Sequence, residues 1–569
     1  MEELAYEEKQ IPIIQIPIIR VTTITGDAPE QADRRRAWSA AAITLAFLAL
    51  VAVGAASHEM WRDEVRAFSI ATAERVPVHL FANLRNEGHP ALWYVLLYLA
   101  SLVGGWSRFA LPVTSALVAA TGVWLLARYA PFPLWQRALF AFGAIPAYEY
   151  AVMCRNYGIS MTLLFAFCAL GERRHTRPLL TGVVLALLAN TNVHAALLAG
   201  LLVLVWLGES ARHAGAVRSI PRRTLAGCAV ALAGCAACAL QVRPDAASTV
   251  LAHPLTIAGL TRAVGQVLAN PGAPFQLAFI QHAVNPEMGW LVAVPSPVGD
   301  IWAERLGWIV TDAMFLAVAI VLARRPLLLL AFLGAVGGLG AFFLEVYVGS
   351  RRHQGLLYVF VIALLWLAAT AGERREPGPP WWRRLAGATL GAMLMVQLVG
   401  AARLFTLDIR YELSSAPAMA HWLATTPAYR DAILVAEPDS FLETFPYYAP
   451  NRLYVIRERR FATWTRLTAE NRAHLTLGQL VEEGRRLQSA HGRPVLLLLG
   501  YPVEEALRAD TGRLPILYQR SLSWDGADHE RFLREARQVA RFATAVGGER
   551  YTVYAFTDPL GAGTVSGAR

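Results

Sequence analysis

Long apolar runs separated by short polar segments dominate residues 37–404. A membrane-crossing helix needs about 20 mostly apolar residues, within a range of roughly 17–25. By this measure the sequence predicts eleven spans, some of them short, at 37–57, 109–128, 136–153, 157–171, 178–192, 194–208, 224–241, 305–323, 326–347, 355–371 and 385–404. The polar residues 1–36 lack the order of a cleavable signal peptide, and we expect them to form a cytoplasmic N-terminal tail.

Arginine clusters orient these spans, because loops on the cytoplasmic side are enriched in basic residues. Such clusters lie at 34–36, 173–174, 212–223, 324–325 and 374–384. All five fall on the cytoplasmic side only if the apolar run 89–104 does not cross the membrane. We therefore predict that this run forms an interfacial or re-entrant helix within a first outer loop, 58–108. Its aromatic residues suit the membrane surface.

Residues 405–569 are more polar and carry only short apolar stretches, at 432–435, 453–456, 494–499 and 551–554. Amphipathic segments separate some of them, which indicates an α/β domain with a mainly parallel sheet. Counting spans places this domain outside the cytoplasm. The predicted fold class is a polytopic α-helical membrane protein with about eleven transmembrane helices, an interfacial helix and a C-terminal extracytoplasmic α/β domain.

Composition agrees with a membrane protein and excludes some functions. Of the 569 residues, 55% are hydrophobic and 17% are charged, whereas a soluble protein has about 25% charged residues. The formal net charge of +10 does not indicate nucleic-acid binding, because the arginines occur in short clusters between apolar runs. The five cysteines lie in or beside apolar segments, where small packing residues are expected.

Two polar clusters in the first outer loop are the first candidates for chemistry. Trp61-Arg62-Asp63-Glu64 follows the first span, and Glu87-Gly88-His89-Pro90 opens the interfacial run. Carboxylates at the end of a membrane span cost free energy. Their presence there favours the interpretation that a catalytic cleft lies at the membrane surface. The alternatives are solvated helix-start charges for Asp63 and Glu64 and a helix-start residue for His89.

Further polar residues gather at the same predicted face. Arg155 and Tyr157 lie between the third and fourth spans, and Asn190–His194 forms a polar turn between the fifth and sixth. Arg351, Arg352 and His353 lie outside, against the inside rule. A phosphate group explains them, since arginine binds phosphate through two hydrogen bonds. Contact with lipid headgroups is the alternative.

The order of these motifs resembles that of the GT-C membrane glycosyltransferases, especially the protein O-mannosyltransferase and 4-amino-arabinose lipid A transferase branch (glycosyltransferase family 39-like). Trp61-Arg62-Asp63-Glu64, Gly88-His89-Pro90, Arg155-Asn156-Tyr157 and Ser350-Arg351-Arg352-His353 carry the resemblance, as do 439–441 and 445–452 near the predicted strands. The chain departs from the family at Ala91, at Arg155-Asn156 and at Asn192 and His194, where relatives often have a second proline, an acidic residue and a lysine.

The resemblance implies an enzyme that moves a hexosyl or pentosyl group from a polyprenyl-phosphate carrier to an acceptor hydroxyl outside the cytoplasm, with inversion. Asp63 would be the catalytic base and Glu64 its alternative. The residues expected to bind substrate are Glu87, His89, Arg155, Tyr157, Arg351, Arg352 and His353. No cofactor is expected, although Asp63, Glu64 and Glu87 could together hold a divalent metal ion.

Three other functions remain open at this point. A lipid-linked glycan ligase or polymerase would use a diphosphate donor, and a lipid-linked sugar transporter would carry internal repeats and charges near the bilayer midplane. A scaffold would use the C-terminal domain as a binding module. The acceptor, whether lipid, protein or glycan, is not readable from the sequence. The resemblance and the alanine- and arginine-rich composition favour the inner (plasma) membrane of a bacterium.

Overall fold

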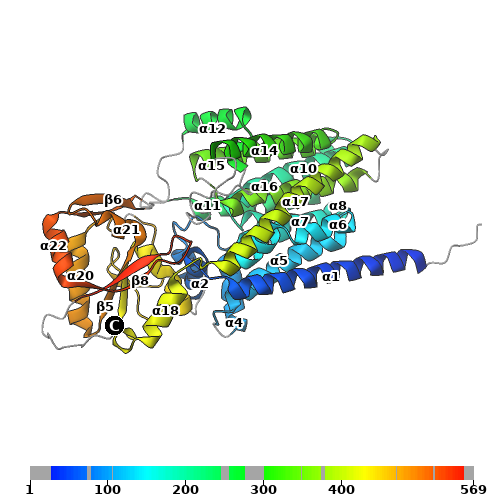
Figure 1. The fold of residues 1–569 in the computed structure, drawn as a ribbon. Helices are drawn as coiled ribbons and strands as arrows, with labels where there is room; N and C mark the ends of the chain where they lie inside the picture. Colours follow the sequence, from blue (N-terminus) through cyan, green and yellow to red (C-terminus); the bar gives the residue numbers. More distant parts are fainter. Residues whose placement is uncertain are drawn as a thin grey trace, which may run out of the picture.

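The computed structural model describes residues 27–73, 79–104, 107–244, 256–275, 300–347, 349–372, 379–468, 471–516 and 519–556. Figure 1 shows a bundle of helices with a smaller strand-containing domain at one end, and α2 (Arg62–Thr72) lies where the two meet. Of the predicted N-terminal tail, residues 1–26 lie outside the described residues. Residues 27–36 belong to the first helix.

The bundle is built from helices that follow the apolar runs of the sequence. They are α1 (Asp27–Ser57), α3 (Leu80–Asn83), α4 (Leu92–Val103), α5 (Ala110–Tyr129), α6 (Leu134–Ala141), the π-helix η2 (Ala144–Val152), α7 (Tyr157–Leu170), α8 (Arg173–Thr176), α9 (Pro178–Ala189), α10 (Val193–His213), the 3-10 turn η3 (Val217–Ser219), α11 (Arg222–Val242), α12 (Ile257–Ala269), the 3-10 turn η4 (Ala273–Phe275), α14 (Asp300–Leu322), α15 (Pro326–Glu345), α16 (Arg351–Gly372) and α17 (Pro380–Arg410).

Among the described residues, seven helices are long and apolar enough to cross a membrane, and each coincides with a predicted span. They are α1, α5, α10, α11, α15, α16 and α17. The predicted spans at 157–171 and 178–192 form the shorter apolar helices α7 and α9. The predicted span 136–153 is broken into α6 and η2, where Gly143 and Pro146 interrupt regular hydrogen bonding. The chain is an integral membrane protein, and the number of eleven spans stays a prediction.

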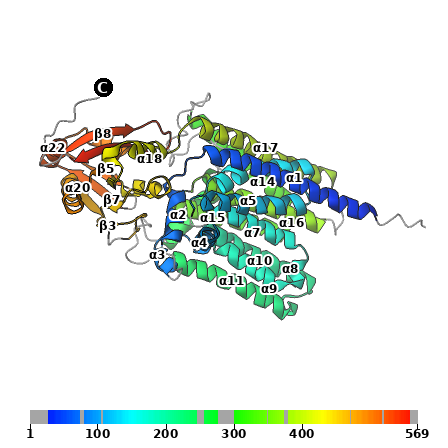
Figure 2. The same ribbon diagram turned by 90° about the horizontal axis from the view of Figure 1, so that it is seen from below.

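The run 89–104 forms α4, which has 12 residues. At 1.5 Å per residue, it is about 18 Å long, well short of the roughly 30 Å hydrocarbon core of a bilayer. It packs against α2, at the end of the bundle that faces the C-terminal domain (Figures 1 and 2). Its length therefore agrees with the predicted interfacial helix, whose place at the membrane surface stays a prediction.

The arginine-rich segments gather at the other end of the bundle. Figure 1 shows the start of α1, α6 and α8 at the end remote from the C-terminal domain. There Arg36 donates to the carbonyl of Ala130, and Arg174 forms an ion pair with Glu209. The separation of basic ends from the α2 end matches the pattern from which the orientation was predicted.

α16 lies at the centre of the bundle. Its residues from Leu356 to Leu367 are all buried, whereas α1 and α11 leave apolar side chains exposed along one side. A helix that is apolar all round must be surrounded by other helices or lipid. The central position of α16 places its first residues, which include Arg351 to His353, in the interior at the α2 end.

The C-terminal domain is a mixed α/β structure, so the prediction of a mainly parallel sheet is wrong. Its main sheet has the order β1 (Ile433–Glu437), β5 (Val495–Gly500), β9 (Tyr551–Phe556) and β8 (Ala536–Phe542). β1 and β5 are parallel, but β9 is antiparallel to both of its neighbours. β8 carries several exposed polar side chains, and for that reason the apolar pattern did not reveal it.

Two smaller sheets complete the strands of the domain. β4 (His474–Thr476) is parallel to β7 (Arg520–Trp524), which is antiparallel to β6 (Gly512–Ile516), and β2 (Tyr454–Val455) pairs with β3 (Arg460–Phe461). The helices are α18 (Ala416–Thr425), the 3-10 turns η6 (Pro427–Tyr429) and η7 (Asp439–Thr444), α19 (Phe445–Tyr448), α20 (Leu477–His491), α21 (Tyr501–Ala506) and α22 (Gly526–Glu535). Because α17 continues to Arg410, the domain begins a few residues after the predicted boundary at 405.

β1 and β5 of the main sheet are buried on both faces. Ile433, Val435 and Leu497 contribute to one apolar cluster, and Leu434 and Leu498 contribute to another on the opposite face. Strands covered on both faces are continuously apolar rather than alternating, which explains the unbroken runs that the sequence shows at β1 and β5. The domain has its own core and holds η7 and α19 against α2.

Candidate active site

The start of α2 fixes the two adjacent carboxylates Asp63 and Glu64. The helix begins at Arg62, and acidic residues in a first turn are stabilised by the partial positive charge of a helix N-terminus. The Glu64 side chain turns back and accepts a hydrogen bond of 3.2 Å from the backbone N–H of Trp61. Neighbouring residues of a helix point in different directions, so the two carboxylates have different surroundings.

The Glu64 side chain is fully buried, and both of its carboxylate oxygens have partners. Its carboxylate accepts a hydrogen bond of 2.7 Å from the backbone N–H of Cys154 and lies 3.1 Å from Nε2 of His58. Nδ1 of the same histidine lies 3.2 Å from Asp408 near the end of α17. Burial alone would lower the pKa of His58, but the attraction of Glu64 and Asp408 outweighs burial and raises it well above its usual value. A charged His58 thus joins α1, α2 and α17.

Asp63 is the more accessible carboxylate, with 33% of its side chain exposed. Its Oδ2 lies 3.1 Å from Nη2 of Arg352, and Oδ1 lies 3.9 Å from Nε of Arg62. Arg155 donates to the backbone carbonyl of Asp63. Burial would raise the pKa of Asp63, but the positive charges of Arg155, Arg352, Arg62 and Arg66 outweigh burial and lower it. Asp63 therefore stays ionised at neutral pH.

Arginine nitrogens without a partner surround this carboxylate. Within the part of the chain that the structure describes, Nε and Nη1 of Arg352 and Nε of Arg155 are buried and have no hydrogen-bond partner. A buried donor left unpaired costs about 1–3 kcal/mol. Several such donors beside one another suit an anion that offers several oxygens, as a phosphate does. Arg352 also lies over the ring of Trp61, 5.4 Å from its centre.

Glu87 and His89 lie beside the arginines. The Glu87 carboxylate accepts two hydrogen bonds from Arg66, of 2.8 and 2.6 Å. Nδ1 of His89 lies 3.2 Å from the carbonyl of Glu87. Burial and the charge of Arg155 lower the pKa of His89 to about 4, so the ring is neutral at pH 7. With its Nδ1–H donated to the carbonyl, Nε2 of His89 is free to accept a hydrogen bond.

Aromatic and histidine rings form the inner wall. The ring of His353 lies 5.2 Å from that of Tyr157 and 5.4 Å from that of His194. Both ring nitrogens of His194 are buried without a hydrogen-bond partner among the described residues. The sequence placed His194 in a polar turn, and Asn192 does cap α10 there by accepting from the N–H of Ala195. This turn was predicted at the same face as the other candidate residues, but not the contact of the His194 ring with His353.

Arg351 lies apart from Asp63. Its Nη1 is 3.4 Å from Oε1 of Glu149 on η2, and both side chains are buried. Consecutive residues of a helix point about 100° apart, and the two arginines have different partners here. Of the two arginines that the sequence singled out together, the structure brings Arg352 to Asp63 and Arg351 to Glu149.

Three carboxylates, two from the C-terminal domain and one from the first outer loop, join that domain to the region of α2. Arg66, which holds Glu87, also pairs with Glu443 of η7. Glu549 accepts a hydrogen bond of 2.8 Å from the backbone N–H of Arg62, and Glu59 accepts from the N–H groups of 413 and 414. Both the start and the middle of α2 are thus fixed by this domain. The sequence did not indicate these contacts, because each partner is isolated and far away along the chain.

No group of three or more His, Cys, Asp or Glu side chains within the described ranges is placed to hold a metal ion. Of the three carboxylates considered from the sequence, Glu64 is engaged by His58 and Glu87 by Arg66. The independence from metal stays a prediction.

The chain has no match to known proteins in sequence and a weak similarity in structure. No protein-family model matches it, and no curated protein matches it. Among solved structures, it is similar to the crystal structure of ArnT from Cupriavidus metallidurans bound to undecaprenyl phosphate, with 13% identity and a TM-score of 0.43. The similarity covers 92% of this chain and 99% of that one. At so low a score the function has to be argued from the site itself.

Proposed function

We propose that the protein is a membrane glycosyltransferase that moves a sugar from a polyprenyl-phosphate carrier to a hydroxyl of an acceptor, with inversion at the anomeric carbon. One observation carries this proposal. Asp63 forms a partly exposed ion pair with Arg352, and the same guanidinium keeps two buried nitrogens without a partner among the described residues. A base and an incompletely paired cation lie side by side, which is what transfer from a phosphate leaving group requires.

Arg352 and Arg155 would bind the phosphate of the donor. Their unpaired nitrogens supply hydrogen bonds to its oxygens, and their charges stabilise the negative charge that grows on the phosphate as it leaves. The apolar helices of the bundle suit the isoprenoid chain attached to that phosphate. Arg351 is bound to Glu149, and we assign it to holding the start of α16 rather than to the phosphate.

Asp63 would act as the base. The acceptor oxygen attacks the anomeric carbon, its proton passes to the Asp63 carboxylate, and the bond between that carbon and the phosphate oxygen breaks with its electron pair left on the phosphate. In the free protein the arginines lower the pKa of Asp63 and make it a weak base. A bound phosphate would share Arg352 and relieve this effect, so Asp63 becomes a better base once the donor is present. Glu64, buried and hydrogen-bonded, is the less suited carboxylate.

His89, Tyr157 and His353 would position the sugar. Neutral His89 offers Nε2 as an acceptor for a sugar hydroxyl, while Glu87 holds Arg66 and the loop that carries His89. The rings of Tyr157 and His353 provide an aromatic wall beside Arg352. Each of these residues comes from a different segment, so the site depends on the folded bundle as a whole.

We further propose that the α2 end of the bundle and the C-terminal domain face away from the cytoplasm, in the inner membrane of a bacterium. The arginine-rich ends lie at the opposite end of the bundle, as the inside rule requires. Nucleotide sugars are confined to the cytoplasm, and a lipid carrier solves the supply of activated sugar on the other side.

The proposal is tested by incubating the purified protein in nanodiscs with radiolabelled polyprenyl-phosphate sugars and a membrane extract that supplies lipid, protein and glycan acceptors. We expect label from at least one polyprenyl-phosphate sugar to move to an acceptor. Polyprenyl-diphosphate sugars form the comparison arm, and transfer from these alone would replace the proposal by a ligase. The absence of transfer from every donor, in protein that is shown to be folded, would contradict the proposal.

A further inference from the structure

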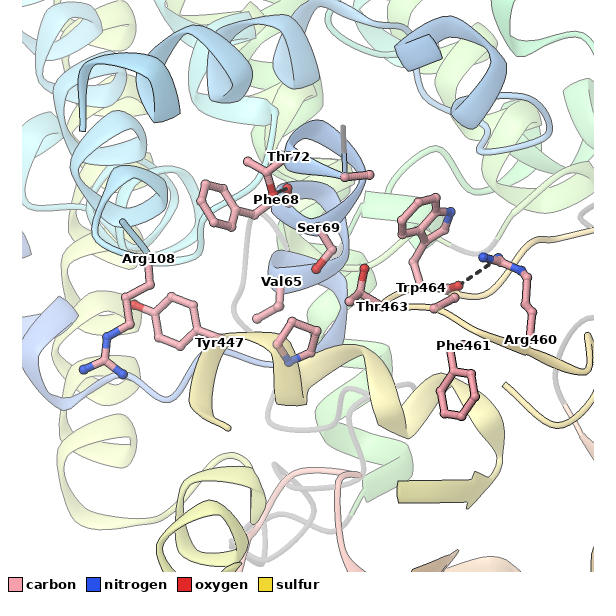
Figure 3. A pocket seen from close by; sticks show the side chains of 13 residues that line it. Val65, Phe68, Ser69, Thr72, Arg108, Tyr447, Arg460, Phe461, Thr463 and Trp464 are labelled. Carbon is pink, nitrogen blue, oxygen red and sulfur yellow. Dashed lines mark hydrogen bonds between the residues drawn. The ribbon is translucent and has the colours of Figure 1, made fainter. Parts of the chain in front are cut away.

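A cavity of about 480 Å³ lies between α2 and the C-terminal domain, away from the candidate active site. Its volume falls within the range of about 300–1,000 Å³ that is usual for small-molecule sites. Figure 3 shows α2 on one side of the cavity and the segment from Arg460 to Trp464, with Tyr447, on the other.

The α2 wall of the cavity is one stripe of the helix. Val65, Phe68, Ser69 and Thr72 line it, and their spacing of three and four residues places them on a single face. At about 100° per residue, Asp63 lies on the opposite face. The cavity and the candidate active site therefore share a helix but open on different sides of it.

Aromatic side chains form much of the wall. Phe68 lines the cavity from α2, and Tyr447 and Trp464 line it from the C-terminal domain. Phe461 lies at its edge, with its ring packed on Tyr454 and His491. The flat, apolar C–H face of a sugar ring packs well against such rings through many small dispersion contacts. Ser69 and Thr463 add hydroxyl groups for which no hydrogen bond is found among the described residues. A wall of aromatic rings with neighbouring hydroxyl groups suits a sugar ring.

Two arginines reach the cavity, and they differ. Arg460 is committed, since its Nε lies 2.5 Å from Glu458 and its Nη2 donates to the carbonyl of Trp464. Arg108 is exposed and lies over the ring of Tyr447, 5.7 Å from its centre. Within the described ranges Arg108 has ring contacts but no ion pair or hydrogen bond. The cavity thus has one positive charge available for an acidic ligand.

We propose that this cavity binds an acidic sugar unit of the acceptor, with the ring packed on Trp464 and Tyr447 and the acidic group paired with Arg108. The proposal rests on the proposed function, because it takes the acceptor to be a glycan or glycolipid. The acid can be a carboxylate or a phosphate, since a guanidinium binds both. This subsite would hold the acceptor while one of its hydroxyls reaches Asp63.

Saturation-transfer NMR with the full-length protein in nanodiscs tests the proposal without donor or turnover. The probes are glucuronate, glucose 6-phosphate and neutral glucose. We expect saturation of one or both acidic sugars and much weaker saturation of glucose, and the two acidic probes distinguish a carboxylate from a phosphate ligand. In Arg108→Gln we expect binding of the acidic probe to weaken by about tenfold, the loss of one charge-assisted hydrogen bond.

Matched variants show whether the saturation signal arises from binding in this cavity. Trp464→Ala should abolish it, whereas Trp381→Ala and Arg493→Gln, which remove exposed side chains elsewhere, should leave it unchanged. Arg108→Gln changes an exposed side chain, so it stays informative even if Trp464→Ala lowers the unfolding temperature. Arg352→Gln should keep the signal, because it alters only the proposed donor site.

Equal saturation of glucose and the acids, or no saturation of any probe, would overturn the proposal. So would a signal that is lost in Arg352→Gln and kept in Arg108→Gln. Failure of the proposed function gives a different result. The saturation signal would still depend on Arg108 and Trp464, but the protein would transfer sugar from no donor.

Discussion

Two buried arginines, Arg457 in the C-terminal domain and Arg352 at the end of the bundle, show how one residue type serves two purposes. Arg457 is fully buried and forms hydrogen bonds of 2.7 and 3.2 Å with Glu437. Its Nη1 donates to the backbone carbonyls of Arg472 and Ala473, and Nη2, which also bonds Glu437, donates to that of Ser521. Arg352 has one ion pair, with Asp63, and two buried nitrogens without a partner in the described part of the chain.

This difference in the pairing of buried donors indicates which arginine can bind a ligand. A buried charge with all its donors paired holds strands together, and breaking such a pair is strongly destabilising. A buried charge with unpaired donors carries a cost that the fold alone does not recover, and a ligand can recover it. We therefore expect the first arginine to stabilise a domain, and we propose that the second binds a ligand.

The largest expected effect is at the base. Asp63→Asn keeps the size of the side chain but cannot accept the acceptor proton, so we expect transfer to fall by about 10²–10⁴-fold. The measurement is the initial rate of label transfer at saturating donor. Asp510→Asn, at an exposed carboxylate of the C-terminal domain, is the matched control. Full activity of Asp63→Asn would move the base elsewhere.

Arg457→Met tests the structural half of the comparison. It leaves Glu437 buried without its partner, so we expect the free energy of unfolding to fall by about 3–5 kcal/mol. Denaturant unfolding in detergent, followed by near-UV circular dichroism, measures the change. The double variant Arg457→Met/Glu437→Met should recover part of the loss, because it removes the unpaired charge. An unchanged unfolding curve for the single variant would show that the pair does not stabilise the domain.

Arg352→Gln should give the reverse pattern. Because few of its donors are paired, we expect donor affinity to weaken by about 10–100-fold, the loss of one or two charge-assisted hydrogen bonds, with little change in stability. Titration with a polyprenyl phosphate, read by thermal shift, measures affinity and stability together. Arg493→Gln serves as the control. A large loss of stability in Arg352→Gln with unchanged affinity for the polyprenyl phosphate would mean that Arg352, like Arg457, has a structural role.

The smallest effect concerns pH. The pKa of His58 is raised by Glu64 and Asp408 above its unfolded value, so its contribution to stability is full below about pH 6.5 and is lost as pH rises through the folded pKa. Between pH 7 and 9 we expect the wild-type protein to lose up to about 1.4 kcal/mol more per pH unit than His58→Gln. Unfolding at several pH values measures both slopes. Parallel slopes would mean that His58 is neutral in the folded state.

Much of the fold could be predicted from the sequence, because burial in lipid requires apolar runs of a given length. Segments from the predicted arginine clusters lie at one end of the bundle, whereas the interfacial position of the short run 89–104 stays a prediction. The break of the run 136–153 was missed, since Gly143 and Pro146 are themselves compatible with an apolar segment. The mixed sheet was missed because β6 and β8 are short or polar and their partners are set by tertiary packing.

The residues of the candidate site could be proposed from the sequence, but the partner of each side chain could not. Asp63 and Glu64 are adjacent, and nothing local says which one is buried. The answer comes from His58 and Asp408, which are 350 residues apart in the sequence. Likewise, the pairing of Arg352 rather than Arg351 with Asp63 depends on the rotation of α16 in the folded bundle.

The shortness of α2 has a consequence for the choice of hydroxyl on the acceptor. The cavity stripe from Val65 to Thr72 lies about 3 to 14 Å along the helix axis from Asp63, on the opposite face, and α2 is held by both the bundle and the C-terminal domain. Asp63, the proposed base, and the cavity stripe therefore cannot move independently, and α2 fixes the distance between them. An acceptor anchored at one end would present only hydroxyls at a matching span to the other, so regioselectivity would follow from helix length rather than from contacts at the reacting atom.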